Sequence, residues 1–420
     1  MIGNERHVGI KALFVCFFVV FTSVAGCKDA SEVHYDRGRA YLRQGECDLA
    51  TEELSKAIAA DPRCAKAYVA RAAAYDAKGE FDLAIADCNE AIELNDDPGG
   101  AYACRGRIHW RKGELDRAIS DCSRAIEIDP SFGFPYCDRG HAYLEKGENL
   151  SAIADFNEAI VRISDLELAY WGRGEAYARQ EQYARALTDF ARCIEIDPNC
   201  ADAYYSRGLV YDALRRYDGA IADYTRVLQI DQTRTDVYCD RGCAYLEQSD
   251  DARAMADFNE VVKAAPDCAL AYWGRGEVYG RRGQFARAIA EYSQCIRLDP
   301  NDADAFHGRG LAYCGQDRYD EAIADYSRAI DIDPKYAEAY DSRGTAYSRR
   351  GNAERALADY NRSIQLDPDD AVTYINRGWA HCRKQEYDLA WADVRRAEEL
   401  GTVVPEAFLR ELRTASERED

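Results

Sequence analysis

The stretch Asp302–Pro334 reads DADAFHGRGLAYCGQDRYDEAIADYSRAIDIDP, and it decides the fold because versions of it recur along the chain every 34 residues. An Arg-Gly pair stands early in the stretch, and an Asp-Pro pair closes it. A fixed period of this length is the signature of a repeat architecture, in which each unit stacks on its neighbours. The glycine keeps the period at Gly38, Gly106, Gly140, Gly174, Gly208, Gly242, Gly276, Gly310, Gly344 and Gly378, and Ala72 fills the one remaining place.

Each repeat divides into two segments with helical patterns. In the first segment, Phe306, Gly310 and Tyr313 follow one another at spacings of four and three, which puts them on one face of a helix. A glycine on that face lets a neighbouring helix approach closely, although glycine lowers helix propensity. The closing Asp-Pro ends the second segment and starts the next pair. The pattern therefore predicts an all-α chain of helix pairs.

With this period and this pattern of small and aromatic residues, residues 31–404 resemble the tetratricopeptide repeat (TPR) family. The resemblance implies a right-handed α-solenoid of eleven helix pairs of 34 residues each. It also implies that the first helices line a concave groove that binds peptides or proteins. Beyond the repeats, residues 405–420 are predicted to form a capping helix and tail, since Gly401 can end a helix and Pro405 can open one.

The first residues differ from the repeats. Residues 1–26 have the pattern of a signal peptide, because the uncharged run 12–26 is shorter than a membrane span of about 20 residues. The run ends in Val-Ala-Gly-Cys at 24–27, which resembles a bacterial lipobox. This resemblance implies that Cys27 carries lipid, that 27–30 is a short tether, and that the chain lies in the bacterial envelope, on the outer side of the cytoplasmic membrane or in the outer membrane. An uncleaved anchor and an ordinary cleaved signal are the alternatives.

Composition and motifs exclude several classes of function. The net charge of −21 argues against nucleic-acid binding, which usually needs a basic face. No HExxH or GxxxxGK[ST] motif occurs, and the sixteen cysteines form no CxxC. Cys137 with His141, and Cys239 with Cys243, have helical i,i+4 spacing but supply only two ligands each. We therefore expect no enzyme activity, no cofactor and no metal site.

An arginine precedes the glycine place in every repeat, and a carboxylate follows the arginine by sixteen residues. One interpretation is a row of cations that binds an anion. The matching numbers of the two residue types favour structural ion pairs between the helices of each repeat. The pairs Arg207–Asp223 and Arg309–Asp325 are representative predictions.

A longer period lies on top of the repeat, because repeats 7–9 look like a copy of repeats 4–6, shifted by 102 residues. The shift predicts two similar patches on first helices that line the groove. They comprise Leu168, Trp171, Glu175 and Arg179 in one copy and Leu270, Trp273, Glu277 and Arg281 in the other. These residues are the candidate partner-binding sites, and the alternative is that each tryptophan fills a gap against the neighbouring repeat.

Together these patterns predict a non-catalytic TPR scaffold, an envelope lipoprotein that binds protein or peptide partners in its groove. The alternative is an accessory of an envelope enzyme system that binds a glycan or a small molecule, since aromatic groove residues suit either ligand.

Overall fold

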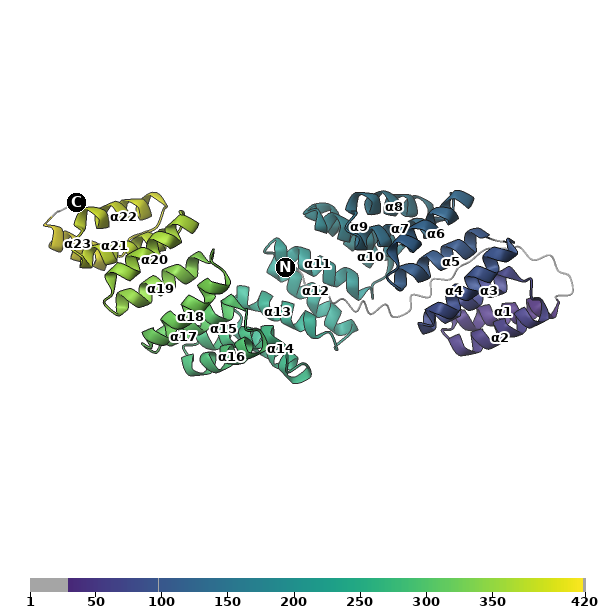
Figure 1. Cartoon of the computed structure of the whole chain (residues 1–420), viewed down its shortest axis with the longest axis horizontal. Helices are drawn as coiled ribbons and strands as arrows, with labels where there is room; N and C mark the ends of the chain where they lie inside the picture. Colours follow the sequence, from purple (N-terminus) through teal and green to yellow (C-terminus); the bar gives the residue numbers. More distant parts are fainter. Residues whose placement is uncertain (1–28, 97, 418–420) are drawn as a thin grey trace. The chain divides into compact units, whose positions relative to one another are not determined.

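The computed structural model describes residues 29–96 and 98–417, and these residues form helices and no strand (Figure 1). The all-α prediction is therefore confirmed. The chain divides into two units, Met1–Val210 and Tyr211–Asp420, and the division falls inside helix α11 (Ala201–Ala213). Among the described residues, no helix is both long and apolar enough to cross a membrane.

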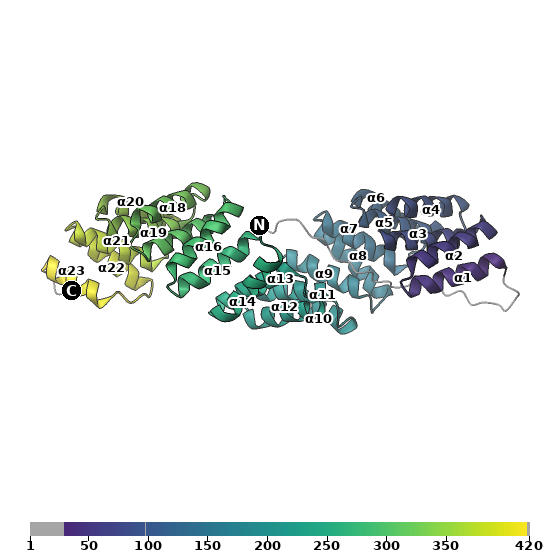
Figure 2. The same ribbon diagram turned by 90° about the horizontal axis from the view of Figure 1, so that it is seen from below.

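Unit 1 is a stack of antiparallel helix pairs, in which odd-numbered helices are the first helix of each repeat and even-numbered helices the second (Figure 2). Its helices before α11 are α1 (Ala30–Arg43), α2 (Cys47–Ala60), α3 (Ala65–Lys78), α4 (Phe81–Leu94), α5 (Pro98–Arg111), α6 (Leu115–Ile128), α7 (Gly133–Glu145), α8 (Asn149–Arg162), α9 (Glu167–Arg179) and α10 (Tyr183–Ile196).

Unit 2 continues the same plan and ends in a single helix, α23, that packs on α21 and α22. Its helices are α12 (Tyr217–Ile230), α13 (Thr235–Glu247), α14 (Asp251–Ala264), α15 (Ala269–Arg281), α16 (Phe285–Leu298), α17 (Ala303–Cys314), α18 (Tyr319–Ile332), α19 (Ala337–Arg349), α20 (Ala353–Leu366), α21 (Ala371–Arg383), α22 (Tyr387–Glu399) and α23 (Glu406–Ser416).

The turn inside each helix pair needs one residue in the left-handed backbone region. Glycine supplies it in some repeats, as Gly283 does with φ of +67°. Other repeats place a larger residue there, as in Asp317 with φ of +58°. Because left-handed backbone is costly for residues with a Cβ, this turn is a property of the whole repeat and not of glycine alone.

An aromatic ring of the second helix fills the space between two consecutive first helices. Phe156 of α8 contacts Gly140 of its own repeat and Gly172 of the next, where an added Cβ would come within 2.8 and 2.4 Å of the ring. The Gly-Arg-Gly sequence that includes Gly172 is therefore a packing device, with both glycines set against aromatic rings. Buried alanines, such as Ala152 and Ala159, complete this small-residue core.

Candidate functional site

First helices pack directly on the next first helix within each unit. In unit 1 these contacts join α1 with α3, α3 with α5, α5 with α7 and α7 with α9, and in unit 2 they join α13 with α15, α15 with α17, α17 with α19 and α19 with α21. Second helices pack mainly against first helices. First helices of consecutive repeats therefore lie closer to one another than second helices do.

The unit-1 patch, defined as Leu168, Trp171, Glu175 and Arg179, lies on α9. Leu168 and Trp171 are half-buried. The indole N–H of Trp171 donates to Ser206 Oγ at 3.2 Å, and the ring packs beside the core cluster around Phe190. Trp171 thus packs against neighbouring repeats and still keeps part of its ring exposed.

An aromatic row, defined as Trp110, His141 and Trp171, crosses three consecutive first helices of unit 1. The His141 ring stacks on Trp110 with centroids 4.9 Å apart and lies 5.6 Å from Trp171. His141 is 3% exposed, and its Nε2 has no hydrogen-bond partner. Burial lowers the pKa of His141 to about 4, so the ring is neutral at physiological pH.

The unit-2 patch, defined as Leu270, Trp273, Glu277 and Arg281, lies on α15. Leu270 is 43% exposed, while Trp273 is half-buried against the core cluster that contains Cys239 and Phe258. The two patches are alike in their half-buried tryptophans, whereas Leu168 is half-buried and Leu270 is exposed.

The neighbours of the two patches differ. A shift of 102 residues leads from Trp110 and His141 to Asp212 and Cys243, although Trp110 lies in repeat 3, just before the copied repeats. Burial and the charge of Glu247 raise the pKa of Asp212. Unit 1 therefore has the His141 ring beside its tryptophan and Trp110 on the other face of that ring, and unit 2 has a carboxyl and a thiol at the corresponding places in the sequence.

The charged members of both patches make structural contacts that the sequence analysis missed. Arg179 donates to the carbonyl oxygen of Leu144 at 2.5 Å, and Arg281 donates to that of Leu246 at the same distance. Each arginine thereby satisfies a carbonyl in the last turn of the preceding first helix. The same contact joins Arg111 to the carbonyl oxygen of Asp76. The recurrence of an arginine at this place in several repeats could therefore have predicted the contact from the sequence.

The two glutamates are also turned toward the protein. Glu175 is 7% exposed, and Glu277 is half-buried and accepts a hydrogen bond from the hydroxyl of Tyr292 at 2.5 Å. The leucine and the tryptophan are therefore the apolar side chains of each patch that a ligand can reach, and Arg179 and Arg281 are exposed beside them.

The predicted pair Arg309–Asp325 is brought together between α17 and α18. Arg309 Nε and Nη2 donate to the two oxygens of Asp325 at 2.7 and 2.8 Å, and Nη1 donates to Ser293 Oγ of α16 at 3.0 Å. Asp325 is 7% exposed, and its hydrogen bonds raise the pKa of Arg309. One guanidinium thus joins the second helices of two consecutive repeats.

Ion pairs of this kind recur in both units. The other described pairs are Arg71–Asp87, Arg105–Asp121, Arg139–Asp155 and Arg173–Asp189 in unit 1, and Arg241–Asp257, Arg275–Glu291, Arg343–Asp359 and Arg377–Asp393 in unit 2. Most of these arginines also bind a Ser, Thr or Asn of the preceding second helix, sixteen residues earlier, which the sequence already displays.

The first repeat does not follow the rule, and the prediction of a pair in every repeat is wrong there. Glu53 instead binds His34 at 2.8 Å and Lys56 at 2.7 Å, while Arg37 is exposed. Because α1 is the first helix of the described residues, these residues include no earlier second helix to supply the third partner that most of the other arginines have. Arg207 and Asp223 lie on opposite sides of the division between the units, and their pairing stays a prediction.

The described residues contain no cluster of His, Cys, Asp or Glu that could hold a metal ion. The cysteines of this part of the chain are all free thiols. Cys27, the predicted lipidation site, lies outside the described residues.

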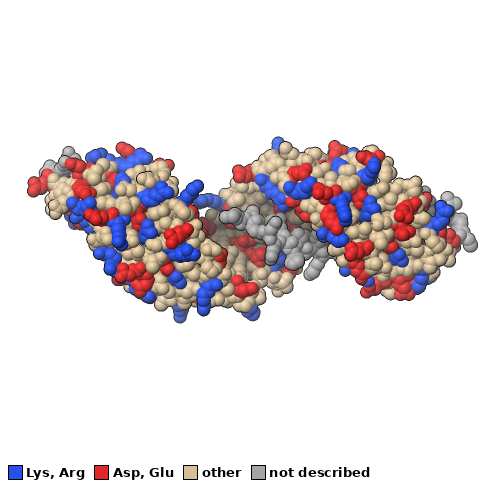
Figure 3. All heavy atoms as spheres, viewed as in Figure 1, with Lys and Arg blue, Asp and Glu red and all other residues tan. Residues whose placement is uncertain are grey.

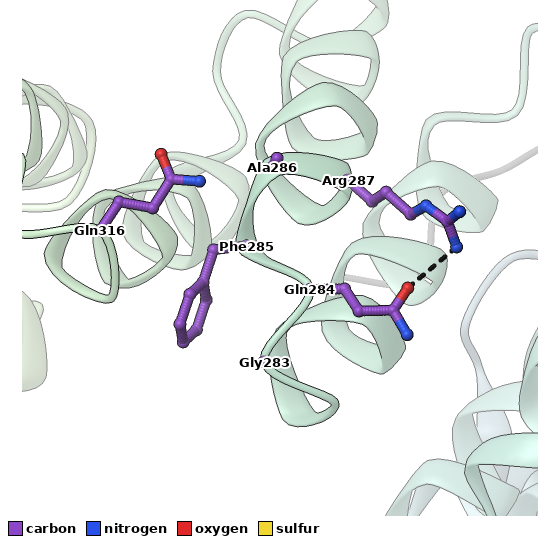
Figure 4. Close-up of a pocket in the computed structure, with 6 residues that line it drawn as sticks. All are labelled: Gly283, Gln284, Phe285, Ala286, Arg287 and Gln316. Carbon is purple, nitrogen blue, oxygen red and sulfur yellow. Dashed lines mark hydrogen bonds between the residues drawn. The ribbon is translucent and has the colours of Figure 1, made fainter.

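A surface pocket of about 540 Å³ lies at the turn between α15 and α16 (Figure 4). It is lined by residues 283–287 and Gln316, and the one charged group, Arg287, donates to Gln284 at 2.9 Å. The pocket therefore offers no reactive group. Acidic and basic side chains are interspersed on the visible face of both units (Figure 3), so no single-sign patch marks a site there.

Family comparisons agree with this architecture. Models described as "Tetratricopeptide repeat" or "TPR repeat" match residues 35–101, 100–132, 135–160, 167–200, 201–234, 239–302, 291–324, 310–351 and 337–370. The chain belongs to the tetratricopeptide repeat family. No curated protein sequence matches it.

Several solved structures are similar to the chain. The anaphase-promoting complex hetero-tetramer Cut9–Hcn1 is similar with a TM-score of 0.50 and 11% identity, covering 92% of this chain and 96% of that one. Yeast Tom70 has a TM-score of 0.43 and 15% identity over 92% of this chain and 95% of its own. MamA is 26% identical over 41% of this chain and 93% of its own, with a TM-score of 0.35.

Proposed function

We propose that the chain is a non-catalytic scaffold that binds peptide segments of partner proteins along the concave side of its first helices. The observation that carries the proposal is the Leu-Trp pair in each unit, Leu168 with Trp171 and Leu270 with Trp273. Each pair lies on a first helix and keeps apolar surface accessible. Partly exposed tryptophans in a packed setting are the residue type that dominates binding energy at protein interfaces.

The contrast between the two patches supports two different ligand segments. The aromatic row that includes Trp171 suits an apolar or aromatic side chain of a ligand. Stacked rings gain binding free energy beyond that of their buried area. The Asp212 carboxyl, which stands 102 residues after Trp110, suits a ligand with a hydrogen-bond donor. Each unit would then bind a different peptide segment, and the two segments would belong to one partner or to two.

Selection from a random peptide display library against the full chain tests the proposal. Affinities of the enriched peptides are compared between the wild-type chain and the double variant Trp171→Ala, Trp273→Ala. We expect a loss of about 30-fold, equivalent to about 2 kcal/mol. The matched control is Leu150→Ala, since Leu150 is 76% exposed on the second helix α8. Unchanged affinity in the double variant, or an equal loss in the control, contradicts the proposal.

We also propose a bacterial envelope location with a lipid on Cys27. Its support is the sequence pattern of residues 12–27 alone. In that location a glycan is the competing ligand class for the aromatic groove residues. Binding of envelope glycans to the wild-type chain, with no enrichment of peptides, would favour the glycan-binding alternative.

A further inference from the structure

Two cysteines of unit 2 lie in direct contact across neighbouring first helices. Cys239 stands on α13 and is 4% exposed, and Cys268 is the residue before the first turn of α15. Their sulfurs are 3.8 Å apart. We propose that Cys239 and Cys268 form a redox-active dithiol that closes to a disulfide and fixes the start of α15 to α13.

The two thiols have different roles because their surroundings differ. The hydrogen bond with Cys239 lowers the pKa of Cys268, and the backbone N–H groups of Ala271 and Leu270 lower it further, against the effect of burial. The same hydrogen bond and burial raise the pKa of Cys239. A thiolate at a helix N-terminus is the form that attacks disulfides, so Cys268 is the attacking sulfur and Cys239 the resolving one.

The oxidant is a disulfide, either of a small thiol or of a protein. Cys268 attacks one sulfur of this disulfide, the S–S bond breaks, and one thiolate leaves. The thiol of Cys239 then loses its proton to solvent, and its sulfur attacks Cys268 and displaces the second thiolate. Two protein thiols are oxidised and one external disulfide is reduced to two thiols, so atoms and electrons balance.

The third nearby cysteine is a poor competitor. Cys243 lies one turn after Cys239 on α13, and burial raises the pKa of its thiol to about 12. The pKa of the Cys239 thiol is raised as well, so Cys239 is favoured by its position, with its sulfur 3.8 Å from that of Cys268. The contact between Cys239 and Cys268 therefore predicts a single disulfide and not a mixture.

The earlier copy of these repeats provides a natural comparison. The longer period puts Cys137 at the place of Cys239 and Leu166 at the place of Cys268, and Leu166 is 3% exposed in its packed position. A leucine is thus accommodated before this first helix. The variant Cys268→Leu removes the dithiol while copying a residue that the fold already uses.

The disulfide would also fix part of the unit-2 patch. Leu270 and Trp273 lie in the first turns of α15, and Trp273 packs beside the cluster that contains Cys239. Oxidation would hold this segment against α13, whatever ligand the patch binds.

Peptide mapping of the full chain tests the proposal. The chain is equilibrated in mixtures of reduced and oxidised glutathione, remaining thiols are alkylated, and tryptic peptides are weighed. Cys239, Cys243 and Cys268 fall on separate peptides, 235–241, 242–253 and 264–275. We expect peptides 235–241 and 264–275 to be joined in most molecules under oxidised glutathione and separate under reduced glutathione.

The same experiment can overturn the proposal. If Cys239 and Cys268 are alkylated separately under fully oxidised glutathione, or if peptide 264–275 joins 242–253 instead, the assignment is wrong. In Cys268→Leu we expect Cys239 to be alkylated in every mixture, with helix content unchanged. Because the wild-type mapping is decisive by itself, the result does not depend on how well the variant folds.

Discussion

Gly310 of α17 lies so close to Tyr326 of α18 that a Cβ on residue 310 would come within 2.6 Å of the ring carbon Cε1. The glycine is therefore what lets the two helices of this repeat close on each other. The second repeat solves the same problem differently, because Ala72 takes the glycine place and packs in one cluster with the smaller Cys88. The sizes of the two partners are matched in each repeat: a glycine faces an aromatic ring, and an alanine faces the smaller cysteine.

Gly310→Ala should lower local stability by about 1–3 kcal/mol, because the ring has no free space to move into. Tyr326→Cys should also destabilise, since it leaves a cavity of ring size. In the double variant the losses should be less than additive, because the alanine would occupy part of that cavity. Hydrogen exchange in α17 and α18 measures each variant, and strictly additive losses would refute the coupling.

Arg309→Ala should destabilise the junction between α16 and α18 by about 3–5 kcal/mol, because Asp325 would stay buried without its cation. Arg275→Ala is the matched comparison. Arg275 makes one hydrogen bond to Glu291, at 2.7 Å, and its Nε has no partner. We expect a smaller loss there. Hydrogen exchange of the second helices is the readout, and equal losses would show that the extra hydrogen bonds of Arg309 contribute nothing.

Stability of unit 1 should fall as the pH drops from about 6.5 toward 4. An unfolded histidine takes up a proton near pH 6.5, whereas His141 in the folded chain takes it up only near pH 4. Protonation therefore favours the unfolded state across this window, by about 3 kcal/mol at its lower end. His141→Phe keeps a ring between Trp110 and Trp171 and should remove this component. Hydrogen exchange of α7 at pH 7 and pH 5 measures it, and an unchanged pH dependence in the variant would contradict the assignment.

Cys27→Ser should abolish lipid labelling completely and leave the precursor uncleaved, if the lipobox resemblance of residues 24–27 holds. Metabolic labelling with a fatty acid, followed by mass measurement of the purified chain, reads both effects. Unlabelled wild-type chain with unchanged processing would remove the lipoprotein proposal.

The repeat architecture could be predicted from the sequence because each packing rule fits within one 34-residue stretch. Arg309 and Asp325 lie in one repeat, so their spacing alone indicated the contact. The partner Ser293 lies sixteen residues before Arg309, in the preceding repeat, so the contact can be recognised only when consecutive repeats are compared.

Contacts between repeats were also the part of the candidate site that the sequence did not predict. Trp171 was identified from its own helix, whereas the aromatic row joins three different places in three consecutive repeats. Trp110, His141 and Trp171 meet only because neighbouring first helices are displaced along one another. The contact between Cys239 and Cys268 has the same origin, since the residue before one first helix meets a residue inside the previous one.

The proposed scaffold function is tested most directly by locating the bound partner on the chain. A photo-crosslinking amino acid is placed in turn at Leu168 and Leu270 on first helices, and at Leu150 and Val161 on the second helix α8, where both side chains are strongly exposed. The account predicts crosslinks to a protein partner from Leu168 or Leu270 and none from the two α8 positions. Crosslinks confined to Leu150 and Val161, or equal at all four positions, would contradict binding along the first helices.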